Sequence, residues 1–340
     1  MTEGVSIIVC CFNSAKRLPN TLKHLAEQQV PDNIPWEIIV VDNASTDDIS
    51  SVAIAQWEKN QVLGVEFRVI KQPIPGLSNA REKGFIEARY EFLLFCDDDN
   101  WLCSDYVNTA FKIMSSDPLI GALGGCGIFE PEQPINTQIE KYKTVYVNGS
   151  QTWAANEHWV YGAGALYRKS LLIALKNRGW EQITSDRIGN KLICGGDVEI
   201  CFMLYLTGYQ ILSDNRLTFK HYVPIKRQSL RYISDLSFWI SYSHVLLTGY
   251  IALMNKDKRP IQKILNGWFM AQTLTLMRLI IPFLYQRLTT RRVLGLSQAR
   301  NFRATYATVY SLIKNRNRII KHHKRIKEII LSETNTLEIT

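Results

Sequence analysis

The first hundred residues alternate short apolar runs with longer polar segments, and this alternation restricts the fold more than any other feature. The runs are rich in β-branched and aromatic residues, as expected for strands buried on both faces. They occupy residues 5–11, 36–42, 65–70 and 90–96. Capping residues and spacing predict helices over about 14–29, after residue 47 and over about 78–88. Such alternation predicts an α/β fold with a Rossmann-like, mostly parallel sheet flanked by helices.

The pattern becomes irregular after residue 118 and regains order over 158–172 and 194–211. We expect these later segments to complete a first domain over residues 1–225. The remainder, 226–340, is predicted to be a mainly helical C-terminal region.

Two long stretches of this C-terminal region are nearly free of charge. Residues 236–255 carry none, and residues 264–286 carry only Arg278. Either has the ~20 residues that a helix needs to cross a bilayer, yet both contain several polar side chains. Three arrangements are compatible with them: buried helices covering the sheet, an interfacial or re-entrant helical hairpin, and spanning helices.

Charge is distributed unevenly along the chain. The net charge of +9 divides into −8 before Arg216 and +17 from Arg216 onward. Basic residues beside apolar helices favour an anionic membrane surface over nucleic acid as the partner of the second half. The seven cysteines form no CxxC pair and the N-terminus resembles no secretory signal. We therefore expect a cytoplasmic protein at the inner face of the plasma membrane, bound peripherally or monotopically.

Three consecutive carboxylates, Asp97, Asp98 and Asp99, directly follow a predicted buried strand. Adjacent carboxylates repel one another, and a cation relieves that repulsion. Oxygen ligands of this kind suit Mn²⁺ or Mg²⁺ that also contacts a substrate phosphate. Because ligands of open α/β sheets bind beyond the carboxyl ends of strands, Phe12, Asp42 and this run should converge on one crevice.

Six motifs in order resemble the family 2 glycosyltransferases, which have the nucleotide-diphospho-sugar transferase fold of GT-A type. They are SIIVCCFN, EIIVVDNASTDD, GLSNAREKG, FLLFCDDDNW, GAGALYRKSLL and GGDVEICFMLYLTGY, and the resemblance covers roughly residues 4–225. Each motif alone is weak, but the shared order and spacing make coincidence improbable.

The resemblance implies a donor site for a nucleotide diphosphate sugar, with a UDP-sugar favoured. The residues that it places there are Phe12, Asn13, Asp42, Arg81, Asp97 and Asp98. It further implies that Asp99, with His221 as a second candidate, binds the metal. Each has a structural alternative: Asp42 could cap a helix, Arg81 could be solvated, and a lone histidine is more often structural.

Asp197 matches the position of the family's general base, which takes a proton from the acceptor hydroxyl. Its alternative role is to cap the helix that follows. The resemblance places the acceptor near Trp159, Tyr161 and Gly162, with Glu199 as a further candidate.

These features predict a metal-dependent inverting glycosyltransferase that transfers a sugar to a glycan or lipid-linked acceptor in bacterial surface polysaccharide synthesis. Two alternatives remain open, a nucleotidyltransferase and a non-catalytic, membrane-associated nucleotide-sugar sensor. A dehydrogenase is disfavoured because no GxGxxG motif follows the first strand.

Overall fold

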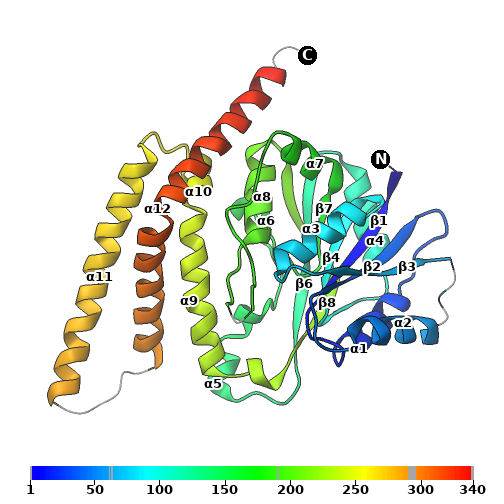
Figure 1. The fold of residues 1–340 in the computed structure, drawn as a ribbon, viewed down its shortest axis with the longest axis horizontal. Helices are drawn as coiled ribbons and strands as arrows, with labels where there is room; N and C mark the ends of the chain where they lie inside the picture. Colours follow the sequence, from blue (N-terminus) through cyan, green and yellow to red (C-terminus); the bar gives the residue numbers. More distant parts are fainter. Residues whose placement is uncertain (1, 61, 63, 190, 290–295, 338–340) are drawn as a thin grey trace.

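The computed structural model describes residues 2–337 except 61, 63, 190 and 290–295. It shows an eight-stranded sheet with helices on both faces and a group of long helices to one side (Figure 1). The strand order is β3-β2-β1-β4-β7-β6-β8-β5. The strands are β1 (Thr2–Cys11), β2 (Trp36–Asn43), β3 (Glu66–Gln72), β4 (Tyr90–Asp97), β5 (Asn100–Leu102), β6 (Ile120–Pro131), β7 (Ala165–Arg168) and β8 (Gln210–Val223).

The helices fall into two groups, one around the sheet and one after it. The first group is α1 (Leu18–Ala26), α2 (Ile49–Asn60), α3 (Leu77–Glu87), α4 (Tyr106–Ser116), α5 (Thr137–Glu140), η1 (Lys143–Tyr146), α6 (Ala154–Glu157), α7 (Lys169–Asn177), α8 (Gly196–Leu206) and η2 (Ile225–Arg227). The second group is α9 (Leu230–Leu246), α10 (Thr248–Met254), α11 (Ile261–Thr289) and α12 (Leu296–Leu337).

The sheet is mixed. β1 to β4 pair in parallel, β7 runs antiparallel between β4 and β6, and β5 pairs antiparallel with β8. The predicted α/β architecture with a mostly parallel sheet and a helical C-terminal region is therefore confirmed. The parallel strands β1, β2 and β4 end at one edge, where Cys10 lies opposite Asp97 and Cys11 opposite Asp42.

Alternate residues of β1 supply two hydrophobic cores, one on each face of the sheet. Ile7 and Val9 pack in the core that includes side chains of α1, α2 and α4. Ile8 packs on the other face, in a core shared with α3, α7, α8, α9, α10 and α12. Because both faces are covered, the strands are apolar on both sides, which explains their continuous apolar runs.

Helix α1 begins at Leu18, several residues later than the sequence predicted. Pro19 stands in its first turn, a position that proline favours. The preceding residues form a turn in which the Ser14 carbonyl accepts hydrogen bonds from the amides of Arg17 and Leu18. This turn leaves the loop after β1 free to contact the loop after β2.

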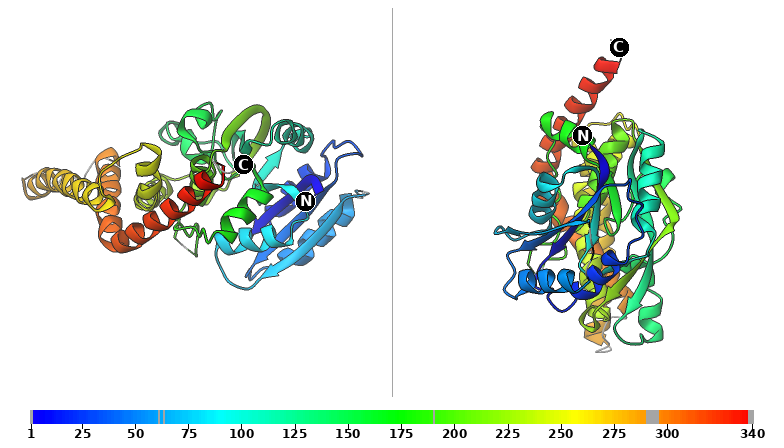
Figure 2. Two further views of the ribbon diagram at one scale, coloured as in Figure 1. Left: turned by 90° about the horizontal axis from the view of Figure 1, so that it is seen from above. Right: turned by 90° about the vertical axis from the view of Figure 1, so that its right-hand side faces the viewer.

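The two uncharged stretches of the C-terminal region differ in burial. α9 and α10, bent by 57° at their junction, pack into the core beside α8. Residues 261–281 of α11 form a helix long and apolar enough to span a bilayer. Only 6% of the most apolar 18 residues of this helix are buried. Seen from two directions, α11 is the outermost helix, beside α12 and away from the sheet (Figures 1 and 2).

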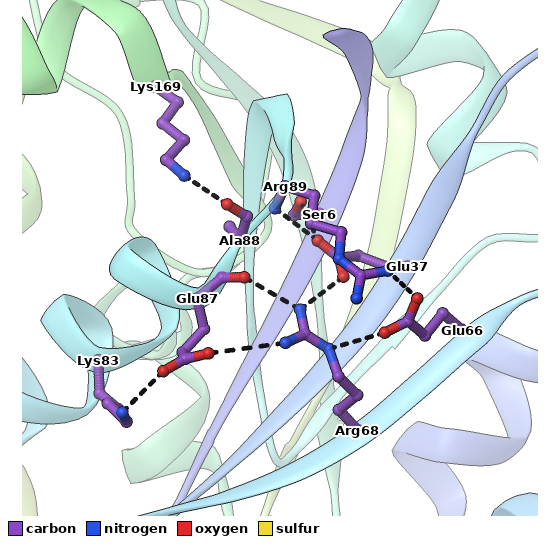
Figure 3. Close-up of polar contacts among 9 residues, drawn as sticks. All are labelled: Ser6, Glu37, Glu66, Arg68, Lys83, Glu87, Ala88, Arg89 and Lys169. Atoms are coloured by element: carbon purple, nitrogen blue, oxygen red, sulfur yellow. Dashed lines mark hydrogen bonds and ion pairs between the residues drawn. The ribbon is translucent and has the colours of Figure 1, made fainter. Parts of the chain in front are cut away.

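A buried carboxylate joins β1, β2, β3 and α3. Glu37 on β2 is fully buried and accepts hydrogen bonds from the Ser6 hydroxyl at 2.8 Å and the Arg89 amide at 2.7 Å. Arg68 on β3 pairs with it at 2.7 Å and also contacts Glu66 and Glu87 (Figure 3). A buried charge of this kind requires its partners, so the network locks α3 against the strands.

We expect Arg68→Ala to destabilise the fold by about 3 kcal/mol, because it leaves the buried Glu37 carboxylate without its counter-charge. Chemical denaturation of the full chain measures the change. The control is Arg216→Ala, which removes an exposed ion pair with Asp214 and should leave the unfolding midpoint unchanged. Equal midpoints for Arg68→Ala and the wild type would contradict this account of the network.

Candidate active site

Two loops at the carboxyl edge of the sheet are joined by side-chain hydrogen bonds. Asn13, with a φ of 48°, accepts at Oδ1 from the Thr46 amide at 2.7 Å. The backbone amide of Asn13 donates to Ser45 Oγ. Asp42 accepts from the Ser45 amide at 3.2 Å and from the Ser50 hydroxyl at 2.9 Å. Phe12 stands beside them with 47% of its surface exposed. The edge thus combines an open aromatic ring with a rigid polar rim.

The Asp97–Asp99 run leaves the end of β4 as a turn, in which Asp98 and Asp99 point to different sides. Asp98 faces α1, where the Arg17 guanidinium contacts it at 3.0 and 3.2 Å. Asp99 faces β8 and η2, with Arg227 at 2.9 Å and His221 Nε2 at 3.7 Å. Burial and the neighbouring Asp99 charge raise the pKa of Asp98 above its usual value. Burial acts in the same direction on Asp99, but Arg227 and His221 outweigh it and lower the pKa of Asp99.

The surroundings of His221 suit a metal ligand. Its Nδ1 lies 2.7 Å from the Tyr146 carbonyl oxygen, which can only accept, so Nδ1 carries the proton. In the neutral form of the ring, Nε2 then carries a lone pair on the side of Asp99. A backbone carbonyl that fixes the tautomer in this way is a common outer partner of metal-binding histidines.

Asp99 and His221 therefore fit one divalent cation, although they do not complete its coordination. In the part of the chain that the structure describes, no three His, Cys, Asp or Glu side chains form a metal-binding group. Mg²⁺ and Mn²⁺ sites commonly take their remaining ligands from water and substrate phosphate.

A second charged group lies around the start of α8. Arg81 on α3 pairs with Asp186 at 2.9 Å, and Asp186 also accepts from the Gly196 amide at 2.8 Å. Asp197 accepts from the Gly162 amide at 2.6 Å. Burial disfavours the charge of Arg81, but the neighbouring carboxylates of Asp186 and Asp97 outweigh it and raise the pKa of Arg81. Burial and the Asp186 charge raise the pKa of Asp197, which is the direction that a base working near neutral pH requires.

Three aromatic rings cluster in the loop before Gly162, whose amide donates to Asp197. Trp153, Trp159 and Tyr161 contact one another with ring centroids 5.6 to 5.8 Å apart. Gln151 fixes this loop by accepting from the Tyr161 amide at 2.6 Å and donating to the Gly125 carbonyl. Burial and the charge of Asp197 raise the pKa of Tyr161, which indicates that the two side chains are close.

Glu199 does not belong to this surface, and its expected role as an acceptor contact is corrected here. Its side chain is fully buried, and its carboxylate accepts hydrogen bonds from Ile183, Thr184 and Tyr250. A carboxylate closed off in this way has no surface for an incoming molecule. On the helix it points away from Asp197, into the core.

Sequence reasoning missed Arg17 and Asp186, which supply the counter-charges of Asp98 and Arg81. Asp186 is a single acidic residue in an irregular segment, and no motif marks it. Arg17 follows the first strand at a position that was predicted to be an ordinary helical turn. Their roles depend on contacts between distant segments, which the local sequence does not encode.

The sequence model described as glycosyl transferase family 2 matches residues 6–175, which is half of the chain. The chain belongs to this family. The match covers the edge of the sheet with Phe12, Asp42 and the Asp97–Asp99 run, and it ends before Asp197 and His221.

Two relatives of this family member are poly-beta-1,6-N-acetyl-D-glucosamine synthases. The Staphylococcus epidermidis protein is 25% identical over 220 residues, which is 63% of this chain and 48% of the relative. The Staphylococcus aureus (strain COL) protein is 22% identical over 269 residues, which is 76% of this chain and 59% of the relative. The chain thus spans only about half of the length of these curated relatives.

The mannosyltransferase PcManGT from Pyrobaculum calidifontis, solved in complex with GDP-Man and Mn2+, has a similar fold. Its TM-score is 0.56 at 17% identity, with 93% of this chain and 88% of that chain covered. This similarity supports the GT-A type of fold in the family 2 chain.

Gly162 has no room for a side chain, and this gives a test of the geometry. A Cβ there would lie 2.9 Å from an Arg81 nitrogen and 3.0 Å from the Asp197 Cβ. Gly162→Ala should therefore lower the free energy of unfolding by about 1–3 kcal/mol. Gly267→Ala is the control, since nothing lies within 4 Å of its Cβ position and alanine favours a helix. If both variants unfolded like the wild type, Arg81, Asp197 and Gly162 would not be in contact.

Proposed function

We propose that the chain is a metal-dependent inverting glycosyltransferase that transfers a sugar from a nucleotide diphosphate donor to a hydroxyl of a glycan or lipid-linked acceptor. The observation that carries the proposal is the position of Asp197. Its partly buried carboxylate lies beside Arg81 and accepts a hydrogen bond from the Gly162 amide, directly after the aromatic loop of Trp159 and Tyr161. Family membership supplies the reaction class.

Asp197 would accept the proton of the acceptor hydroxyl as that oxygen attacks the anomeric carbon. The Gly162 amide holds its Oδ2, and the Val198 amide holds its Oδ1, so the carboxylate has a fixed direction. One base opposite the leaving group allows direct displacement with inversion. The aromatic rings present flat apolar surfaces of the kind that pack against sugar rings.

The donor would lie along the carboxyl edge of the sheet, with its base against Phe12 and its ribose near Asp42 and Asp97. Asn13 shapes the rim of this site through its contacts with the neighbouring loop. Arg81 and Arg227 are the cations beside the expected diphosphate, and Asp98 supports the run through Arg17. A UDP-sugar is favoured by the family resemblance and is consistent with relatives named for a polymer of N-acetyl-D-glucosamine.

Asp99 and His221 would hold Mn²⁺ or Mg²⁺. When bound, the cation neutralises charge on the departing nucleoside diphosphate. The fold neighbour that is recorded with GDP-Man and Mn2+ is consistent with such a site.

Transfer is tested with the purified full chain, a panel of UDP- and GDP-sugars with oligosaccharide acceptors, and Mn²⁺, Mg²⁺ or a chelator. Metal-dependent release of nucleoside diphosphate is expected. Asp197→Asn should lower kcat by about 10²–10⁴-fold, because the base is lost, with little change in donor Kd. Asp99→Asn should instead weaken metal-dependent donor binding.

Asp214→Asn, which removes the carboxylate that pairs with the exposed Arg216 on β8, is the matched control and should retain full activity. Donor binding with no turnover by the wild type would favour a nucleotide-sugar sensor. Turnover that survives Asp197→Asn would remove the base assignment.

We further propose that the C-terminal region holds the enzyme on the cytoplasmic face of an anionic membrane, close to a lipid-linked acceptor. The outer side of α11 presents four apolar side chains that are 51% to 67% exposed: Met270, Leu274, Met277 and Ile281. Exposed cations stand on the adjacent α12, at Lys314, Arg318, Lys321, Lys324 and Lys327. An apolar stripe beside a basic one suits the boundary between acyl chains and anionic headgroups.

Vesicle sedimentation tests this docking. The wild type should bind phosphatidylglycerol vesicles in a salt-sensitive way and phosphatidylcholine vesicles weakly. Leu274→Glu with Ile281→Glu should reduce binding by about tenfold or more, because charged side chains are costly in the apolar layer. Ile54→Glu, at an exposed position of α2, is the control. Unchanged vesicle binding by the α11 variant, or a dimer in gel filtration that this variant dissociates, would refute membrane docking by α11.

A further inference from the structure

Glu199 is the centre of a buried polar network that the proposed reaction does not use. Its Oε1 accepts from the Ile183 amide at 2.7 Å and the Tyr250 hydroxyl at 2.8 Å. Its Oε2 accepts from the Thr184 amide at 2.8 Å and the Thr184 hydroxyl at 2.6 Å. Two of the partners are backbone amides, which can only donate, and the two hydroxyls also donate, so the geometry suits an ionised carboxylate.

The segment that Glu199 binds is the one that reaches the active site. Asp186, two residues after Thr184, pairs with Arg81 and accepts from the Gly196 amide. The Gln182 side chain donates to the Gly196 carbonyl at 2.8 Å. The segment 182–186 therefore binds both the amide and the carbonyl of Gly196, the first residue of α8, directly before Asp197.

The C-terminal helices contact Glu199 itself and the two residues directly before this segment. The Tyr250 hydroxyl of α10 accepts from Trp180 Nε1 at 2.8 Å while it donates to Glu199. On α12, His322 Nε2 lies 2.9 Å from the Glu181 carbonyl oxygen and 3.6 Å from Glu199 Oε1. Helix α10 packs against both α12 and α8, as these contacts require.

We propose that Glu199 is a positioning residue for the active site and that α10 and α12 are part of the catalytic machinery through it. Glu199 fixes the backbone of Ile183 and Thr184, and this segment places Asp186 against Arg81 and the start of α8. The direction of the Asp197 carboxylate follows from that placement. The inference rests on the proposed role of Asp197 as the base.

The ionisation of Glu199 gives the network a pH dependence. Burial raises its pKa to about 7, against the lowering effect of Thr184, Ile183 and Tyr250. His322 on α12 faces Glu199. Burial lowers the pKa of His322, and the charges of Arg318 and His323 lower it further. Below pH 7 a protonated Glu199 loses the charge that strengthens the bonds from the Ile183 and Thr184 amides, so the hold on segment 182–186 should weaken on acidification.

Tyr250→Phe is the sharpest test, because it removes one hydroxyl and keeps the ring. Without this donor the pKa of Glu199 rises further. The fall of kcat on the acid side of its pH profile should therefore begin at a higher pH. Loss of a hydrogen bond to a charged group also predicts a fall in kcat of about tenfold near neutral pH, with donor Kd nearly unchanged. The control is Tyr242→Phe on α9, since no hydrogen bond of the Tyr242 hydroxyl is found among the described residues.

A second readout is independent of turnover. Hydrogen exchange of the amides in segment 182–186, corrected for the intrinsic effect of pH, should become faster as the wild type is acidified through pH 7. Glu199→Gln places an amide group against two donors, and it should accelerate exchange at every pH by about tenfold and abolish the pH dependence.

The outcomes separate this inference from the proposed function. A wild type without turnover but with the expected exchange pattern would refute the transferase and leave the network established. The positioning role alone would be overturned if the wild type showed normal turnover that depends on Asp197 while Tyr250→Phe and Glu199→Gln had no effect. No effect means an unchanged kcat, an unchanged fall of kcat at low pH and an unchanged exchange pattern.

Discussion

Charge neutralisation at the end of β4 is the constraint on which the arrangement of this protein depends. Three successive carboxylates at the end of a buried strand repel one another, and two of them are almost fully buried. The fold brings Arg17 to Asp98 from the start of α1, and it brings Arg227 and His221 to Asp99 from the far end of the sheet. Both halves of the chain are thereby tied to one point, where the donor is proposed to bind.

Local patterns were sufficient for the fold and for which side chains gather at the carboxyl edge of the sheet. Apolar runs with β-branched residues predicted the strands because each is buried on both faces, and strand ends predicted which side chains gather at one edge. The family and the sheet class were confirmed. The start of α1 was predicted too early, because the polar residues before Leu18 form a turn that contacts the neighbouring loop.

The remainder depends on partners far apart in sequence. Arg81 was singled out, but its pairing with Asp186 requires knowledge of where the irregular segment before α8 lies. Glu199 stands two residues from Asp197, and helical geometry alone indicates that the two point in different directions. Only the packing of α10 and α12 shows that the side facing Glu199 is closed. Burial of this kind is a property of tertiary contacts.

The pairing of β5 with β8 has a consequence for the order in which the protein is made. Asn100 lies opposite His221, so the loop that carries the carboxylates is anchored by a strand synthesised much later. The parallel strands β1 to β4 are close in sequence and can associate while the ribosome is still translating the second half. During that interval Asp98 can already pair with Arg17, but Asp99 has water as its main partner, because Arg227 does not yet exist. A nascent chain can therefore possess four of the eight strands and still lack the partners that Asp99 has in the complete fold.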